Sequence, residues 1–318
     1  MQKKSKHLKV QTLKASDVHV PANVPASARK TYISNYLQVT KSTGRLMLFA
    51  GDQKIEHLND DFFGQDIPEE NNDPEHLFQI ASAGTIGVFA AQHGLIAKYG
   101  PDFPDVSYLV KMNSRTNAVS AKDKDPLSKA LCTMEDVLDL QKNGKLNIVG
   151  IGYTLYVGSE FEAEMMAEAG RLIAQAHELG LLTVIWAYPR SRSMKDPKDA
   201  HLIAGGAGVA CSLGSDFVKV NVPTQGPRSL REATGAAGRT GVIVSGGDIL
   251  TPKDFLRMVY DTIHYAHAAG SATGRNVHEH PLEDAVRMTD AISSIVYGNK
   301  TVDEAYRVFL GKDSYKLM

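Results

Sequence analysis

The feature that most constrains the fold is an alternation of short apolar runs with helical patterns, repeated eight times after residue 45. Each run has the length of a strand, and most are rich in β-branched or aromatic residues. Eight such units in about 270 residues fit a closed (β/α)8 TIM barrel better than an open, doubly wound sheet. The expected strands are residues 45–52, 86–92, 107–113, 146–155, 181–189, 216–222, 241–247 and 271–277.

The first 40 residues do not fit a β/α unit. We predict that residues 1–40 form an N-terminal arm, with a helix near residues 26–41, and that residues 41–318 form the barrel as one domain. The chain has 318 residues, 43% of them hydrophobic, which is enough for one large core.

Charge and composition narrow the class of partner. The formal net charge is -1, so no long-range field would recruit nucleic acid or an anionic membrane. No run approaches the roughly 18 apolar residues of a membrane span, and no apolar segment follows the basic start as in a signal peptide. Two cysteines, Cys132 and Cys211, cannot form a disulfide framework. We therefore expect a soluble cytoplasmic protein with no nucleic-acid or membrane partner.

The sixth expected strand, in "SDFVKVNV", carries a lysine at its centre. Strand alternation places Lys219 on one face with Phe217 and Asn221. A buried ammonium is costly unless it is paired or loses its proton. Lys219 is therefore either a satisfied structural lysine or an amine kept for chemistry.

Other unusual polar residues fall at the same end of the expected strands. Asp52 ends the first, Lys111 lies late in the third, and Asn221 lies near the end of the sixth. Trp186 and Tyr188 end the fifth, in "WAYPR". Barrel enzymes place their chemistry at the carboxyl ends of the strands, so the joint position of these residues predicts an active site. Lys111 fits either a second active-site cation or a satisfied core residue.

Two glycine-rich turns follow the seventh and eighth strands. They contain Ser245, Gly246 and Gly247 in "SGG", and Gly274 and Arg275 in "TGRN". Glycines let backbone N–H groups approach an anion, and this fold commonly binds phosphate at these two positions. Each turn alone is compatible with an ordinary tight turn, but together they predict a phosphate site.

These residues and their motifs resemble those of a known family. Between about Gly44 and Gly298 the chain resembles the archaeal-type class I fructose-bisphosphate aldolases of the DeoC/LacD group, through "GDQKIEH", "WAYPR", "SDFVKVN", "VSGG" and "GRNVHEHP". The resemblance implies that Lys219 forms a Schiff base, that Tyr188 donates and accepts the proton, and that Asp52 is its acid/base partner. It implies that the two glycine turns bind a ketose 1-phosphate, that Trp186 lines the pocket, and that Lys111, Arg190 and Asn221 contact the substrate. It also implies a homo-oligomer, with a decamer among the expected sizes.

The chain departs from this pattern at the distal end of the expected substrate. Many relatives have a His-Gly pair where this chain has Gln53 and Lys54, and Ser191 replaces the glycine that usually follows the YPR motif. A longer loop, "SRSMKDPKDAH", follows. Whether Lys54 or Arg190 would bind a distal phosphate stays open.

Three functions are compatible with the sequence. The first is reversible cleavage of fructose 1,6-bisphosphate to dihydroxyacetone phosphate and glyceraldehyde 3-phosphate, in glycolysis and gluconeogenesis. The second is a related Schiff-base synthase, such as 2-amino-3,7-dideoxy-D-threo-hept-6-ulosonate synthase. The third is an inactive barrel that serves as a binding protein. The "HEH" at 278–280 has no further acidic or cysteine cluster beside it, so we expect no metal and no cofactor.

Overall fold

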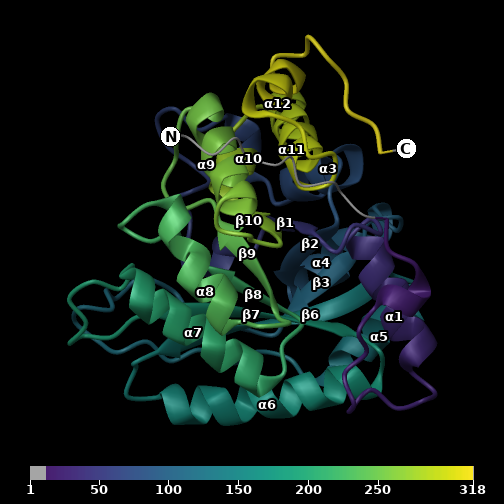
Figure 1. The fold of residues 1–318 in the computed structure, drawn as a ribbon, viewed down its shortest axis with the longest axis vertical. Helices are drawn as coiled ribbons and strands as arrows, with labels where there is room; N and C mark the ends of the chain where they lie inside the picture. Colours follow the sequence, from purple (N-terminus) through teal and green to yellow (C-terminus); the bar gives the residue numbers. More distant parts are fainter. Residues whose placement is uncertain (1–11, 318) are drawn as a thin grey trace, which may run out of the picture.

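The computed structural model describes residues 12–317, and its centre is a closed barrel of eight parallel strands (Figure 1). The order around the barrel is β1-β10-β9-β8-β7-β6-β3-β2. All eight expected strands are present, which confirms the (β/α)8 fold. The barrel strands are β1 (Leu46–Ala50), β2 (Val88–Gln92), β3 (Tyr108–Lys111), β6 (Ile148–Val157), β7 (Leu182–Pro189), β8 (Phe217–Val220), β9 (Gly241–Ser245) and β10 (Gly270–Thr273). A short antiparallel pair that the sequence did not predict, β4 (Asn113–Ser114) and β5 (Lys129–Ala130), lies beyond β3.

Helices surround the barrel, with α9 to α12 on one side and α6 and α7 on the other (Figure 1). Threonine caps explain several of the starts: the hydroxyls of Thr133, Thr251 and Thr301 each accept the backbone N–H three residues later. The helices are α1 (Arg29–Val39), α2 (Gln53–Glu56), α3 (Glu75–Ala83), α4 (His93–Tyr99), α5 (Met134–Asn143), α6 (Glu162–Glu178), α7 (Ala200–Leu213), α8 (Arg231–Ala236), α9 (Pro252–His264), α10 (Arg275–His278), α11 (Leu282–Val296) and α12 (Val302–Phe309). Four 3-10 turns are η1 (Ala15–Asp17), η2 (Glu69–Asn72), η3 (Gly100–Asp102) and η4 (Pro227–Leu230).

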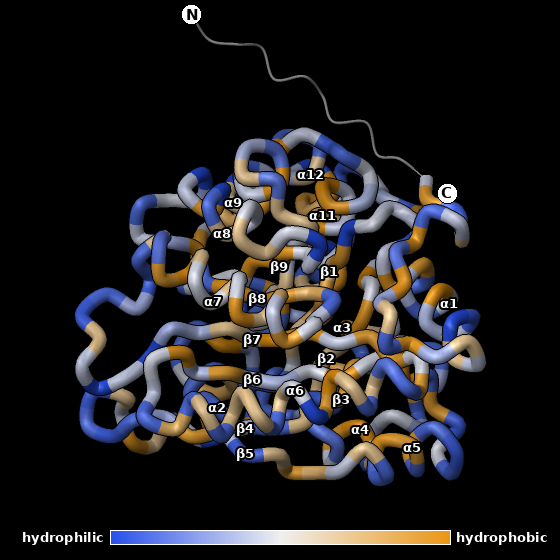
Figure 2. Tube along the Cα trace, turned by 60° about the horizontal axis from the view of Figure 1, so that its bottom comes forward, coloured by the Kyte–Doolittle hydropathy of each residue, from blue (hydrophilic) through white to orange (hydrophobic). Residues whose placement is uncertain are grey.

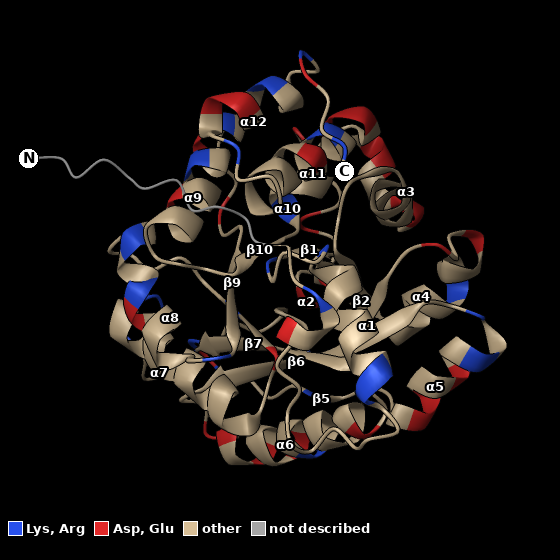
Figure 3. Cartoon of the chain, turned by 45° about the vertical axis from the view of Figure 1, so that its right-hand side comes forward, with Lys and Arg blue, Asp and Glu red and all other residues tan. Residues whose placement is uncertain are grey.

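Apolar residues gather along the strands, and the outer loops are polar (Figure 2). Lysine and arginine residues, and aspartate and glutamate residues, lie mainly on the outer helices and loops (Figure 3). This distribution follows from burial of the strands on both faces, by side chains inside the barrel and by helices outside it.

Helix α1 packs against the amino-terminal ends of β7 and β8, opposite the site described below. Its Tyr32 hydroxyl donates to Asp216 (2.6 Å), its Asn35 amide donates to the carbonyl of Gly180 (2.9 Å), and its Tyr36 ring stacks on Phe217.

The strand register brings one tryptophan and two lysines together inside the barrel. Trp186 on β7 pairs directly with Lys219 on β8. On the other side of β7, the ring of Trp186 lies over Gly152 of β6, where an added Cβ would come within 2.5 Å of the indole. Gly152 therefore provides the space for the indole, and β3, next to β6, contributes Lys111.

Two charged segments, residues 59–75 and 122–125, have a composition that predicts solvated loops, but they are partly buried. Within residues 59–75, Phe62 is inaccessible to solvent and its ring stacks on His278 of α10 (4.9 Å between centroids). In the "KDKD" run, the buried Asp125 accepts backbone N–H groups of Glu160 and Arg192 (3.0 and 2.6 Å). In both segments, a single side chain is buried because it contacts residues that lie far away in the sequence.

Candidate active site

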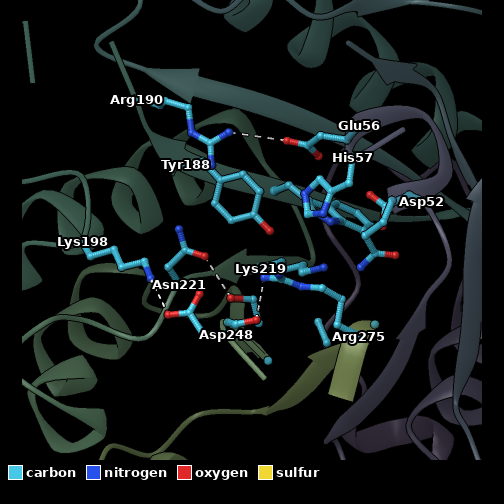
Figure 4. Close-up of a pocket in the computed structure, with 17 residues that line it drawn as sticks. Asp52, Glu56, His57, Tyr188, Arg190, Lys198, Lys219, Asn221, Asp248 and Arg275 are labelled. Atoms are coloured by element: carbon cyan, nitrogen blue, oxygen red, sulfur yellow. Dashed lines mark hydrogen bonds and ion pairs between the residues drawn. The ribbon is translucent and has the colours of Figure 1, made fainter. Parts of the chain in front are cut away.

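A cavity of about 230 Å³, open to solvent, lies at the carboxyl ends of the barrel strands (Figure 4). It contains every predicted site residue except Lys111. The predicted residues that line it are Asp52, Trp186, Tyr188, Arg190, Lys219, Asn221, Ser245, Gly246, Gly247, Gly274 and Arg275. Gln53, Glu56, His57, Lys198, Asp248 and Ala272 complete the lining.

Lys219 reaches this cavity from β8 and is 4% exposed. Its Nζ lies 5.2 Å from the centre of the Trp186 ring. Among residues 12–317, no hydrogen bond or ion pair reaches this Nζ within the usual distances. Burial lowers the pKa of Lys219 and Arg275 adds to the effect, whereas the charges of Asp52 and Glu56 oppose it. The site therefore favours the neutral, nucleophilic amine.

Lys111 lies on the other side of the same indole, with its Nζ 5.1 Å from the ring centre. Unlike Lys219, it is fully satisfied: it donates to Thr154 Oγ1 (2.7 Å) and to the carbonyl of Asn113 (3.0 Å). Its Nζ also lies 3.9 Å from the carboxylate of Asp52. The structure thus places Lys111 outside the cavity lining, where it forms a buried ion pair with Asp52.

Tyr188 ends β7 and presents its hydroxyl to the cavity (Figure 4). Burial, together with the charges of Glu56 and Asp52, raises the pKa of this phenol well above its usual range. The raised pKa favours the protonated phenol, which can donate a hydrogen bond.

A stack of side chains holds Tyr188 in place. The guanidinium of Arg190 lies between the rings of Tyr188 (5.9 Å) and Tyr156 (5.5 Å). Glu56, at the end of α2, lies 3.6 Å from Arg190. Its carboxylate also accepts a hydrogen bond from the Tyr156 hydroxyl (3.0 Å). Glu56 was not identified from the sequence, although it follows Asp52 by four residues and so faces the same side of a helix.

The two glycine turns after β9 and β10 lie against each other. The Arg275 guanidinium donates to the carbonyl of Gly247 (2.8 Å). The Asn276 amide donates to the carbonyl of Asp248 (3.1 Å). The Ser245 hydroxyl donates to Asn221 (3.0 Å). These bonds join the turns into one concave unit, in which a positive φ of 64° at Gly247 requires glycine.

Gly274 is required for another reason, which is close approach. A Cβ at this position would lie 2.0 Å from the side-chain nitrogen of Gln53 and 2.8 Å from the carbonyl of Ala50. The glycine therefore lets the β10 turn pack directly on the end of β1. Gln53, which departs from the family pattern, fills the space beside it.

The cationic side chains that could bind a distal phosphate differ in whether they line the cavity and whether they are already paired. Lys54 donates to Asn59 Oδ1 and to the carbonyl of Asn72 (both 3.0 Å), and does not line the cavity. Arg190 lines the cavity but is paired with Glu56. Lys198, which the sequence did not indicate, enters from the longer loop and lies 3.7 Å from Asp248.

The "HEH" run contributes a buried histidine close to the cavity rather than a group of metal ligands. Burial lowers the pKa of His278 to about 3. Within residues 12–317, no three His, Cys, Asp or Glu side chains are arranged to hold a metal ion. In the same part of the chain, no helix combines the length and apolar character that a bilayer crossing needs.

Comparison with known proteins assigns the family. The profile of the DeoC/LacD family aldolases matches residues 46–280. The chain belongs to this family. It is 51% identical over 304 residues to the fructose-bisphosphate aldolase/6-deoxy-5-ketofructose 1-phosphate synthase of Methanocaldococcus jannaschii, covering 95% of this chain and 97% of the relative.

Solved structures give the same result. The fructose-bisphosphate aldolase of Slackia heliotrinireducens superposes with a TM-score of 0.94 at 51% identity, covering 97% of this chain and 98% of that chain. An archaeal fructose-1,6-bisphosphate aldolase, whose catalytic lysine is covalently bound to the carbinolamine intermediate of its substrate, superposes with a TM-score of 0.73 at 30% identity, covering 83% and 99%. The DeoC/LacD aldolase described here is thus a class I, Schiff-base aldolase by family.

Proposed function

We propose that this DeoC/LacD aldolase reversibly cleaves fructose 1,6-bisphosphate through an imine on Lys219. The observation that carries the proposal is the contrast between the two buried lysines beside Trp186. Lys111 is fully hydrogen-bonded and lies outside the cavity. Within residues 12–317, Lys219 has no hydrogen-bond or ion-pair partner. Its Nζ lies 5.2 Å from the centre of the Trp186 ring, and it lines the cavity together with the two glycine turns.

The first half of the reaction forms the imine. With the 1-phosphate in the glycine turns, the Lys219 amine attacks the C2 carbonyl and gives a carbinolamine. The Tyr188 phenol donates its proton to the departing hydroxyl, which leaves as water. The products of this step are a protonated imine and a phenolate, and the two opposite charges stabilise each other.

The second half breaks the bond between C3 and C4. The Tyr188 phenolate takes the proton of the C4 hydroxyl, with Asp52 as the acid/base partner, and the C4 carbonyl forms. The bonding electrons move to C3 and the iminium nitrogen accepts the displaced pair, so an enamine forms and the aldehyde leaves. Protonation at C3 and hydrolysis then release dihydroxyacetone phosphate and restore Lys219.

A second candidate activity is the synthase reaction in the name of the M. jannaschii relative. Disconnecting 6-deoxy-5-ketofructose 1-phosphate between C3 and C4 gives the same dihydroxyacetone phosphate enamine and a three-carbon 2-oxoaldehyde. The distal end of that product carries no charge. The cavity is compatible with such an end, because Arg190 is already neutralised by Glu56 and Lys54 points elsewhere.

The proposal is tested by combining cleavage with trapping of the imine. Purified protein should cleave fructose 1,6-bisphosphate in a coupled assay, with equal rates in the presence and absence of a strong chelator. Borohydride added with dihydroxyacetone phosphate should attach a stable mass to the peptide that contains Lys219. No cleavage and no adduct would indicate an inactive barrel, and an adduct on Lys111 would refute the assignment. Product analysis with phosphorylated and neutral aldehydes separates the two activities.

A further inference from the structure

The carboxylate of Asp61 joins two cationic side chains at the cavity. Its Oδ2 atom contacts the Nδ1 atom of His57 and lies 3.7 Å from the Nε atom of Arg275. The side chain of Asp61 is only 10% exposed, and those of His57 and Arg275 are 26% and 29% exposed. Water therefore screens the interactions among these three groups only partly.

The segment that carries Asp61 is held firmly. Its backbone carbonyl accepts a hydrogen bond from the buried Asn71 amide (3.0 Å), and the next residue, Phe62, is packed against His278. This is the acidic stretch that the sequence suggested was a solvated loop. Its burial fixes the Asp61 carboxylate relative to both β1 and β10.

The contact with Asp61 determines how His57 faces the cavity. With Nδ1 engaged by the carboxylate, Nε2 is the ring nitrogen left to face a ligand, and His57 lines the cavity together with Arg275. Two cations around one carboxylate leave a net charge of +1 when His57 is protonated. That charge lies beside the turn whose backbone Arg275 contacts at Gly247.

We propose that His57 and Arg275, coupled through Asp61, form a two-cation clamp for the 1-phosphate of the substrate. His57 is then a further phosphate-binding residue, and Asp61 is a positioning residue that orients both cations. The inference rests on the proposed function, since it requires that the two glycine turns bind phosphate. The proposal adds a phosphate-binding side chain from the β1 side to a site that is otherwise built from the turns after β9 and β10.

The clamp depends on the protonation of His57. The charged and titratable groups that face it are Asp61, Glu56 of α2, Arg275 and His278 of α10, and Glu279, which directly follows α10. Burial lowers the pKa of His57, but the hydrogen bond and charge of Asp61, aided by Glu56, outweigh it, so the pKa is raised above its usual 6.5. The clamp is complete below this pKa and weakens as the pH rises through it. The KM for fructose 1,6-bisphosphate should therefore increase over that range.

The test compares Asp61→Asn and His57→Gln with a matched control, Asp60→Asn, whose side chain is exposed. Loss of one charge-assisted phosphate contact should raise the KM for fructose 1,6-bisphosphate about tenfold, with kcat within about threefold of the parent. Borohydride trapping with dihydroxyacetone, which has no phosphate, should be unchanged in both variants. The KM of His57→Gln should also lose its dependence on pH, and the control should match the parent.

A double-variant cycle with Arg275→Ala separates the inference from the proposed function. In the Arg275→Ala background, Asp61→Asn should raise KM by a smaller factor than it does in the parent, because the part of its effect that is transmitted through Arg275 is already lost. Parental KM in His57→Gln and Asp61→Asn, or full additivity with Arg275→Ala, would overturn the clamp. If Arg275→Ala itself leaves KM unchanged, the phosphate site of the proposed function is wrong. Should Asp61→Asn fail to fold, His57→Gln alone decides the matter.

Discussion

The two buried lysines should respond in opposite ways to the same substitution, methionine, which replaces most of the apolar stem of the side chain and removes the nitrogen. Lys111→Met should destabilise the protein strongly. Lys219→Met should abolish cleavage and leave stability close to that of the parent. The prediction follows from what each Nζ contacts, because both lysines are almost fully buried and lie about 5 Å from the same indole.

The expected magnitudes come from those contacts. Lys111→Met removes hydrogen bonds to Thr154 (2.7 Å) and Asn113 (3.0 Å), and leaves the carboxylate of Asp52, 4% exposed, without its closest cation. Removing one partner from a buried charged pair costs about 3–5 kcal/mol of unfolding free energy. Lys219→Met removes no hydrogen bond, so its unfolding free energy should stay within about 1 kcal/mol of the parent.

Urea denaturation followed by circular dichroism measures both changes, and a coupled cleavage assay on the same preparations measures activity. Borohydride trapping with dihydroxyacetone phosphate adds a direct readout of the imine. Equal destabilisation by the two substitutions would refute the reasoning. So would a stable Lys111→Met variant that forms no adduct, because Lys111 would then be the nucleophile.

Three further outcomes are expected. Tyr188→Phe should fold and still form the reducible adduct, yet cleave fructose 1,6-bisphosphate about 10²–10⁴-fold more slowly, the usual contribution of a positioned acid/base group; turnover within a few-fold of the parent would leave Asp52 as the leading candidate. Gly274→Ala should lower the unfolding free energy by about 1–3 kcal/mol and raise the KM for the bisphosphate, whereas Gly94→Ala, with no atom within 4 Å of the new Cβ, should do neither. Because Glu56 raises the pKa of Lys219, Glu56→Gln should lower it, so the midpoint of imine formation against pH should move to lower pH; a midpoint that moves upward or stays would contradict this.

Several features of the site could be predicted from the sequence because they depend on local pattern. Strand alternation identified Lys219 as core-facing, and the order of strands and helices placed Asp52, Tyr188 and the two glycine turns at the same end of the barrel. In a parallel barrel all strands run the same way, so a residue late in any strand lies at the carboxyl end. Position along the chain was sufficient for this conclusion.

Other features depend on partners far away in the sequence. Lys111 and Lys219 are the same residue type in similar strands. Lys111 is structural because its Nζ donates to Thr154 on β6 and to Asn113 beyond β3. Within residues 12–317, Lys219 has no such partner and stays available. Arg190 is neutralised by Glu56, and the acidic segment after α2 buries Asp61 against Arg275. The protonation and availability of a buried group are set by desolvation and by its nearest charges, and both depend on which distant segments the fold brings together. Position in the chain was therefore enough to predict which residues meet at the mouth of the barrel, whereas contacts between distant segments determine which of these residues are free to react.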